Sequence, residues 1–344
     1  MTAGEREILE PVDLCRPDGR LDPRAVGWTR HPVHRTALPP TPWPRSPLRG
    51  WGRAKRWEYW ATVTPTHVIA LTVANLDYAA QHQVWVLDRS TGLEVDTVAV
   101  VPLARGTTLP DNLGDGPTRA LARNLAIAFD PVPAGTRLRA RTDRVSVDVV
   151  AVEPPGHESL GVVVPWGDRL FQYTVKDVAR PARGTVTVDG TVHPVPDDGS
   201  WAVLDLGRGR WPYSMRWNWG AGSGVVDGHV VGVQIGGAWT DGTGSTENAL
   251  LVDGRLHKIS ADLVWTYDRS DWLAPWRVHD PARASVDLTF TPFHERAART
   301  DLLLIAAETH QCFGTWSGAM ADDAGTWVGV DGAVGWAEEA RNRW

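Results

Sequence analysis

Short runs of β-branched residues follow one another from Trp57 to the end of the chain, and four copies of Val-Asp-Gly lie among them. Asp-Gly supplies the positive φ angles of a two-residue turn, so each copy predicts an antiparallel hairpin. Only Thr118–Ala128 competes as a helix candidate. An antiparallel chain of 344 residues must close its sheets or stack them. The sequence therefore predicts an all-β protein with two barrel-like or sandwich halves. The four Val-Asp-Gly copies lie at Val188–Gly190, Val226–Gly228, Val252–Gly254 and Val330–Gly332.

The division along the chain follows from proline content. Residues 1–55 carry repeated prolines that forbid regular helix and central strand, so we expect an extended arm. This arm lies on the body of the protein or crosses to a neighbouring chain and forms a homo-oligomer. Residues 56–199 and 200–344 are predicted as the two β halves, with a boundary near Gly199. The prolines of the arm include Pro32, Pro39, Pro40, Pro42, Pro44 and Pro47.

Composition and charge exclude several function classes. The net charge of −6 and the absence of a Lys/Arg run argue against a nucleic-acid partner. No window reaches the roughly 18 apolar residues of a membrane span, and MTAGEREILEPVD lacks the apolar stretch of a secretion signal. Cys15 and Cys312 alone make no disulfide framework, and His31 and His34 find no further ligand at recognisable spacing. We expect a cytoplasmic protein without metal or cofactor.

Tryptophan is in excess, with 19 residues against five tyrosines and five phenylalanines. In RGRWPYSMRWNWGAGSG, a strand over Tyr213–Trp219 would place Tyr213, Met215, Trp217 and Trp219 on one face. The indoles either pack sheets or line a broad apolar cavity. The glycines after Trp219 either bend the chain or let a ligand approach its backbone. We assign ligand binding to Tyr213, Trp217, Asn218, Trp219, Gln234, Trp239 and Asn248.

Glu247 is the first candidate for acid–base chemistry. The preceding strand, His229–Trp239, alternates apolar residues with Gly232, Gln234, Gly236 and Ala238, which leaves room for close sheet packing or for a cavity. The polar loop TDGTGSTEN then delivers Glu247 into another apolar strand, where a carboxylate could work at a cavity mouth. The alternative is a solvated loop that satisfies its own turn.

The second candidate is the pair Glu308 and His310, which fall on one face of a strand. A carboxylate two residues away would raise the histidine pKa, so the pair could transfer protons. The alternative is a polar strand end that emerges into water. The carboxylate-rich end, WAEEARNRW, is interpreted as a solvated surface held by Trp336 and Trp344.

A recognisable set of strings begins at Gly27 (GWTR), Lys55 (KRWEYW), Phe171 (FQYTVKD), Leu204 (LDLGRGRWPYSMRWNWGAGSG), Thr246 (TENALLVDG), Pro275 (PWRV), Asp287 (DLTFTP) and Gln311 (QCFGTWSG), and ends with Arg343-Trp344. Together these strings resemble a bacterial and fungal family, domain-of-unknown-function family 2804. They cover nearly the whole chain, and the family is defined by sequence rather than by an activity. The resemblance implies a relationship to two-part lipocalin-like proteins, among them carotenoid hydratases and cofactor-free cyclases. No motif carries the catalytic residues of those proteins over to this sequence.

Three functions stay open at this point. The first is a cofactor-free enzyme that hydrates, isomerises or cyclises an isoprenoid-like or polyketide-like molecule, with Glu247 or the Glu308–His310 pair moving the proton. The second is a lipocalin-type carrier, which needs the same cavity but no poised carboxylate. The third is a structural protein in which the tryptophans only pack sheets.

Overall fold

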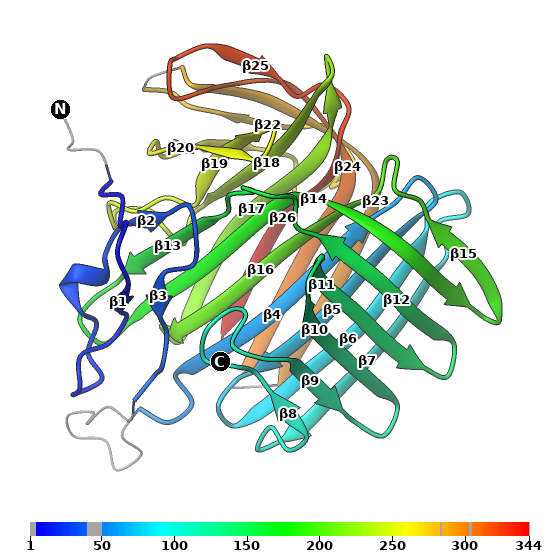
Figure 1. The fold of residues 1–344 in the computed structure, drawn as a ribbon, viewed down its shortest axis with the longest axis horizontal. Helices are drawn as coiled ribbons and strands as arrows, with labels where there is room; N and C mark the ends of the chain where they lie inside the picture. The colour runs from blue at the N-terminus through cyan, green and yellow to red at the C-terminus, as the bar shows by residue number, and fades with distance from the viewer. Residues whose placement is uncertain (1–4, 40–49, 283, 303–304, 344) are drawn as a thin grey trace.

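The computed structural model describes residues 5–39, 50–282, 284–302 and 305–343. Within these ranges the strands form a 14-stranded sheet, a 10-stranded sheet and a two-stranded pair, β1 (Val12–Asp13) with β3 (His34–Arg35). Each large sheet curls into a half-barrel, and the two half-barrels lie against each other (Figure 1). The predicted all-β fold with two antiparallel halves is confirmed.

The first half-barrel follows the strand order β7-β6-β5-β4-β16-β14-β12-β11-β10-β9-β8, with β13, β15 and β2 attached beside this path. Its strands are β2 (Trp28–Thr29), β4 (Ala54–Val63), β5 (His67–Asn75), β6 (Ala79–Asp88), β7 (Glu94–Pro102), β8 (Thr107–Thr108), β9 (Thr118–Leu121), β10 (Leu125–Val132), β11 (Gly135–Thr142), β12 (Val145–Val152), β13 (Leu160–Pro165), β14 (Phe171–Val188), β15 (Thr191–Val195) and β16 (Trp201–Arg210).

The second half-barrel follows the order β20-β19-β18-β17-β26-β24-β23-β22-β21, with β25 beside β24. The chain passes from one sheet to the other between Arg210 and Ser214, downstream of the division predicted near Gly199. Its strands are β17 (Ser214–Val226), β18 (His229–Gly237), β19 (Asn248–Val252), β20 (Arg255–Ile259), β21 (Val264–Thr266), β22 (Trp276–His279), β23 (Val286–Leu302), β24 (Ile305–Ala321), β25 (Trp327–Gly329) and β26 (Ala333–Arg343).

Three of the four Val-Asp-Gly copies form the predicted hairpins. Both central residues have positive φ in each, for example 50° at Asp227 and 83° at Gly228, between β17 and β18. The hairpin predicted at the fourth copy, Val330–Gly332, is wrong. There only Gly332 has positive φ (86°), and β25 and β26 both pair with β24, Gly329 opposite Ala319 and Ala333 opposite Trp316. This copy therefore interrupts one edge of β24 instead of reversing the chain.

The helix candidate Thr118–Ala128 is also wrong, because the segment forms β9 and the start of β10. Thr118 and Ala120 on β9, and Leu125 and Ile127 on β10, are all buried, in the alternation of a strand. Packing in the sheet overrides the helical propensity of the alanines and leucines here.

Apolar side chains form three principal layers: one inside each half-barrel and one between them. Because strands alternate, one strand serves two layers: on β4, Trp60 points into the first half-barrel and Ala61 into the layer between the halves. Large members are Trp60, Leu71 and Phe129 inside the first half-barrel, Trp276, Leu288 and Trp316 inside the second, and Trp85, Phe313 and Trp336 between them.

The described part of the N-terminal segment lies against the body of its own chain. Trp28 on β2 is buried, and β2 pairs with β13. The Arg30 guanidinium donates to Glu7, to Glu158 and to the backbone oxygen of Leu256, so it joins the segment to both half-barrels. Residues 40–49, which hold most of the predicted proline run, lie outside the described residues.

Candidate functional site

A cavity of about 370 Å³ continues the layer between the two half-barrels. Strands β4, β5, β6, β14 and β16 line it from the first half, and β17, β23, β24 and β26 from the second. Alternation decides which residues reach it: on β4, Trp57 and Tyr59 face the cavity, whereas Glu58 and Trp60 are hydrogen-bonded to each other on the opposite face. The site thus exists only where the two sheets meet.

Tryptophans make up one wall of the cavity. Trp211 and Trp239 stack with ring centroids 5.8 Å apart, and Trp57 and Trp217 approach Trp211 edge-on at 5.6 and 5.9 Å. Trp219 adds a further indole, edge-on to Tyr59. Flat rings in these arrangements form a broad, rigid apolar surface.

Each of these five indoles donates its N–H to a side-chain oxygen, and three of the acceptors are carboxyl groups that line the cavity. The pairs are Trp57 with Asp205 (3.1 Å), Trp217 with Glu338 (2.8 Å), Trp239 with Glu247, Trp211 with Gln172 (2.6 Å) and Trp219 with Gln234 (3.0 Å). Phenylalanine would supply the same apolar surface without a donor. The tryptophan excess therefore contributes both the wall and the hydrogen bonds that hold buried acids.

Lys176 joins two of these acids. Its ammonium lies 3.1 Å from Asp205 Oδ1 and 3.3 Å from Glu247 Oε2, and 4.1 Å from the centroid of the Trp219 ring. Burial lowers the pKa of Lys176, but the two carboxylates outweigh burial and the pKa is raised. For Glu247 burial has the larger effect: it raises the pKa of this carboxyl group, although Lys176 and the Trp239 N–H act to lower it. Lys176 is thus a buried, charged side chain that pairs with both carboxyl groups on this side of the cavity.

Glu338 has a different environment. It is buried on β26, and its Oε1 accepts the Trp217 N–H. Within the described part of the chain, no cation lies at ion-pair distance from it, and no donor is hydrogen-bonded to its Oε2. Burial raises the pKa of Glu338 to about 7, and the Trp217 hydrogen bond only partly opposes this. Near neutral pH this carboxyl group is therefore divided between its acid and its base form.

The row of small residues predicted on β18 makes room for Glu247. A Cβ on Gly236 would lie 2.1 Å from Glu247 Oε1, so a larger residue there would displace the carboxyl group. Gln234 accepts from Trp219 and donates to the backbone oxygen of Glu247 (3.0 Å). Gly236 and Gln234 therefore hold Glu247 and Trp219 in place from the side of the wall that faces away from the cavity.

Four of the sequence-predicted residues line the cavity: Trp217, Trp219, Trp239 and Glu247. Gln234 and Asn248 lie behind the wall, where Asn248 accepts from the Gly236 N–H (2.7 Å) and donates to the Ala261 oxygen (2.8 Å). Tyr213 is 41% exposed and lies beside Arg53. Asn218, on the opposite face of β17, donates to the Tyr267 hydroxyl.

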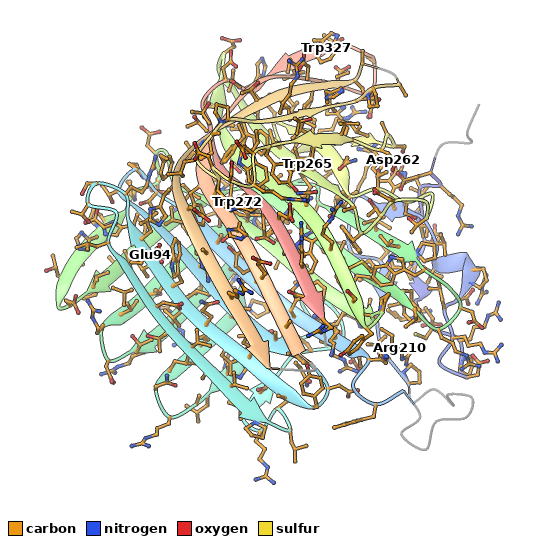
Figure 2. All side chains as sticks on the ribbon, turned by 180° about the vertical axis from the view of Figure 1, so that it is seen from behind. Glu94, Arg210, Asp262, Trp265, Trp272 and Trp327 are labelled. Carbon is orange, nitrogen blue, oxygen red and sulfur yellow. The ribbon has the colours of Figure 1, made fainter. Side chains whose placement is uncertain are left out.

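Glu308 and His310 do not line this cavity. They lie 3.5 Å apart on β24, on the strand face opposite to Gln311, which does line it. His310 stacks on Trp272 at 4.0 Å and also contacts Glu295 (2.7 Å). Figure 2 shows Trp272 over the strands of the second half-barrel, on the side turned toward the viewer. The predicted pair is thus a separate cluster.

Sequence reasoning missed Lys176, Asp205 and Glu338. Each was visible as a charged residue inside an apolar or aromatic run, in FQYTVKD, AVLDLG and GWAEE. The interpretation of WAEEARNRW as a solvated surface is wrong, because Glu338 and Glu339 are only 7% and 3% exposed. Pairing of β26 between β17 and β24 buries them. Trp344 lies outside the described residues.

The glycines of β17 make room for a buried side chain rather than for a ligand. A Cβ on Gly222 would lie 2.5 Å from Cδ1 of Trp316, and one on Gly220 would lie 2.8 Å from Cζ2 of the same ring. Trp316 belongs to the core of the second half-barrel. These glycines therefore let β17 approach a buried indole, and they do not bend the strand.

Two further features concern the described residues alone. No helix among them combines the length and the apolar character that a membrane crossing requires. They contain no group of three or more His, Cys, Asp or Glu side chains placed to hold a metal ion.

Comparisons with known proteins agree on the family and the fold. The model of a domain of unknown function, DUF2804, matches residues 5–344. The sequence has no match among curated proteins. A structure of CghA with Sch210972 aligns with a TM-score of 0.57 at 12% identity, over 96% of this chain and 97% of that one. A protein from Nitrosomonas europaea assigned as AttH gives 0.53 at 13% identity, over 83% and 92%. Kievitone hydratase from Nectria haematococca gives 0.50 at 11% identity, over 85% and 89%.

Proposed function

Because the chain belongs to the DUF2804 family and has the two-part lipocalin-like fold, we propose that it binds an apolar small molecule in the cavity between its half-barrels. There it would transfer a proton to that molecule without a cofactor. The observation that carries the proposal is Glu338, a buried carboxyl group with a pKa of about 7 inside an aromatic cavity. An acid with a pKa near the working pH is well suited to general acid–base catalysis.

The proposed step begins with Glu338 protonated. The O–H bond at Oε2 breaks, the proton adds to one carbon of a substrate double bond, and the neighbouring carbon becomes cationic. In hydration, water attacks that carbon and returns a proton to the carboxylate. In isomerisation, a neighbouring C–H bond breaks and its proton returns to the carboxylate. In cyclisation, a second double bond of the substrate first attacks the cationic carbon and forms the ring C–C bond, and a C–H bond beside the new cation then returns the proton. Trp217 contributes its ring to the cavity wall and could stabilise the cation. Trp219 is less available, because Lys176 already lies over its ring.

The proposal gives Glu247 a different task from Glu338. Both lie in the cavity wall, but both oxygens of Glu247 are engaged, one by the Trp239 N–H and one by the Lys176 ammonium. A proton on Glu247 would have to compete with Lys176 for the same oxygen. We therefore assign Glu338 as the proton donor and acceptor, and Glu247 as the group that keeps Lys176 charged and in place.

Kievitone hydratase, with the same fold, supports a hydration as one form of this chemistry, by analogy only. The substrate class that we propose is an isoprenoid-like or polyketide-like molecule, because five indoles form a broad apolar wall and polar side chains elsewhere in the lining could bind its oxygen atoms.

The test begins with mass spectrometry of an organic extract of the purified, denatured protein, which identifies a co-purifying apolar compound. Candidate polyenes supply the substrate if the extract is empty. Wild type is then compared with Glu338→Gln, Glu247→Gln and, as a control outside the cavity, Glu308→Gln. We expect Glu338→Gln to lower kcat by at least about 100-fold, as loss of a general acid does, and Glu308→Gln to leave kcat unchanged. A compound that binds wild type and is returned unchanged would make the protein a carrier and contradict the proposal.

A further inference from the structure

Two rows of side chains face each other across the cavity, one on each sheet, because strand register aligns the residues of neighbouring strands. The row of the first half-barrel crosses β14, β16, β4, β5 and β6 and consists of Lys176, Asp205, Tyr59, Thr72 and Gln83. The row of the second half-barrel crosses β17, β26, β24 and β23, which Figure 2 shows side by side, and consists of Trp219, Glu338, Gln311 and Arg296.

The cavity has one cation at each end of these rows, and each cation lies over an indole. Lys176 Nζ lies 4.1 Å from the centroid of the Trp219 ring, and the guanidinium carbon of Arg296 lies 4.6 Å from that of the Trp85 ring on β6. The two cations differ in how they are neutralised. Lys176 lies between two carboxyl groups, whereas within the described part of the chain no carboxylate is at ion-pair distance from Arg296. A half-buried cation without a counter-ion favours the binding of an anion beside it.

Arg296 and a neighbouring tyrosine also keep hydrogen-bond donors that the protein does not use. Arg296 Nη1 donates to Gln311 Oε1 (3.1 Å), and Gln311 Nε2 donates to the Tyr59 hydroxyl (3.4 Å). Among the described residues Arg296 makes no other hydrogen bond, and no acceptor there takes the hydrogen of the Tyr59 hydroxyl. Burial raises the pKa of Tyr59 to about 12, so this hydroxyl is a donor at neutral pH. Gln311 thus holds together two groups whose remaining hydrogens are available to an oxygen-bearing ligand.

We propose that Arg296 and Tyr59 form an anion subsite of the cavity, and that the ligand is an apolar molecule with a single carboxylate. A guanidinium binds a carboxylate through paired, charge-assisted hydrogen bonds. A monoanion fits better than a phosphate, because only one cation of the lining lacks a counter-ion and the lining already holds three carboxyl groups.

The inference rests on the proposed function in one respect, because it also places the carboxylate relative to the double bond that Glu338 protonates. Arg296 pairs with Gln311, and Gln311 pairs with Glu338, so two strand spacings separate Arg296 from Glu338. Two spacings amount to about 10 Å between the backbones. The reacting double bond should therefore lie several carbons away from the carboxylate, with the apolar part of the molecule toward Trp219.

The experiment measures ligand binding to the full chain by isothermal titration calorimetry at neutral pH. Farnesoic acid and farnesol are the probes, since they differ only in the polar end. We expect wild type to bind the acid at least about tenfold more tightly than the alcohol. Arg296→Met keeps an apolar stem beside Trp85 and should abolish this preference, while the affinity for farnesol stays within about twofold of wild type. Tyr59→Phe should weaken binding of the acid about threefold.

Arg137→Met is the matched control, because Arg137 lies on β11 outside the cavity and is ion-paired with Asp148. It should bind both ligands as wild type does, and thermal unfolding checks that every variant is folded. A wild type that binds the acid no more tightly than the alcohol overturns the inference, and so does a wild type that binds neither. Tighter binding of farnesyl phosphate than of the acid, or an acid preference that survives Arg296→Met, also overturns it. Binding is measured without turnover, so this inference can fail while Glu338→Gln still lowers kcat and the proposed function stands.

Discussion

Replacing Lys176 with methionine tests how the cavity holds its buried acids. Methionine keeps most of the length of the side chain and removes the charge. Lys176 Nζ lies 3.1 Å from Asp205 and 3.3 Å from Glu247, and only 6% of the side chain is exposed. Removing one partner of a buried ion pair costs about 3–5 kcal/mol, because the remaining charge stays buried without a counter-ion. We therefore expect Lys176→Met to lower the free energy of unfolding by about that amount at mildly alkaline pH.

The cost should depend on pH in a defined direction. Burial already raises the pKa of Glu247 in the folded protein, and removal of Lys176 should raise it further. A carboxyl group whose pKa is higher in the folded than in the unfolded state destabilises the fold as pH rises through the interval between the two values. The penalty of Lys176→Met should therefore shrink as the pH is lowered from mildly alkaline to acidic values, because Glu247 takes up a proton.

Urea unfolding followed by tryptophan fluorescence measures these free energies, and a double-mutant cycle separates the pair. Lys176→Met with Glu247→Gln leaves only Asp205 without its cation, so it should recover part of the loss. A penalty under about 1 kcal/mol that is the same at both pH values would show that Lys176 behaves as an exposed ion pair does. That result would refute the account of a buried charged cluster.

Three further perturbations have outcomes that follow from single contacts. Gly222→Ala would place a Cβ 2.5 Å from the Trp316 ring and should cost about 1–3 kcal/mol in thermal unfolding; Gly167→Ala, with nothing within 4 Å of its Cβ, should change stability by less than about 0.5 kcal/mol. Glu338→Gln should stabilise the protein by up to about 3 kcal/mol at pH values above the folded pKa of Glu338, which is about 7, because only the ionised carboxylate opposes folding. Below about pH 4.5 the substitution should leave stability unchanged. Equal stability of wild type and variant at alkaline pH would contradict this. Trp217→Ala should weaken binding of the extracted compound more than it lowers the unfolding temperature, and equal losses would identify Trp217 as a core residue.

The fold was largely predictable because its signals are local. Asp-Gly turns and β-branched alternation need only a few neighbouring residues, and three of four turns formed hairpins as predicted. The fourth failed because β24 is long enough to pair with both β25 and β26, which no local pattern reveals.

The site was less predictable because pairing between distant strands creates it. The two-residue alternation of side chains along a strand correctly places Trp217 and Trp219 on one face of β17. The partners of that face come from elsewhere: Glu338 is 121 residues away from Trp217 in sequence, and Lys176 meets Asp205 only through the register of β14 with β16. A charged residue inside an apolar run signals burial, but it does not say which partner it has. Glu308 and His310 show the converse, since a shared face does not say which cavity the face meets.

Direct titration of Glu338 would decide most about the proposed chemistry. Infrared difference spectra between wild type and Glu338→Gln isolate the C=O stretch of one protonated carboxyl group as the pH is raised. The account predicts a band that persists well above the range of ordinary glutamates and disappears with a midpoint near 7. A band that is lost near pH 4.5, the usual value for glutamate, would mean that Glu338 is a permanently charged carboxylate at neutral pH and is not the proton donor.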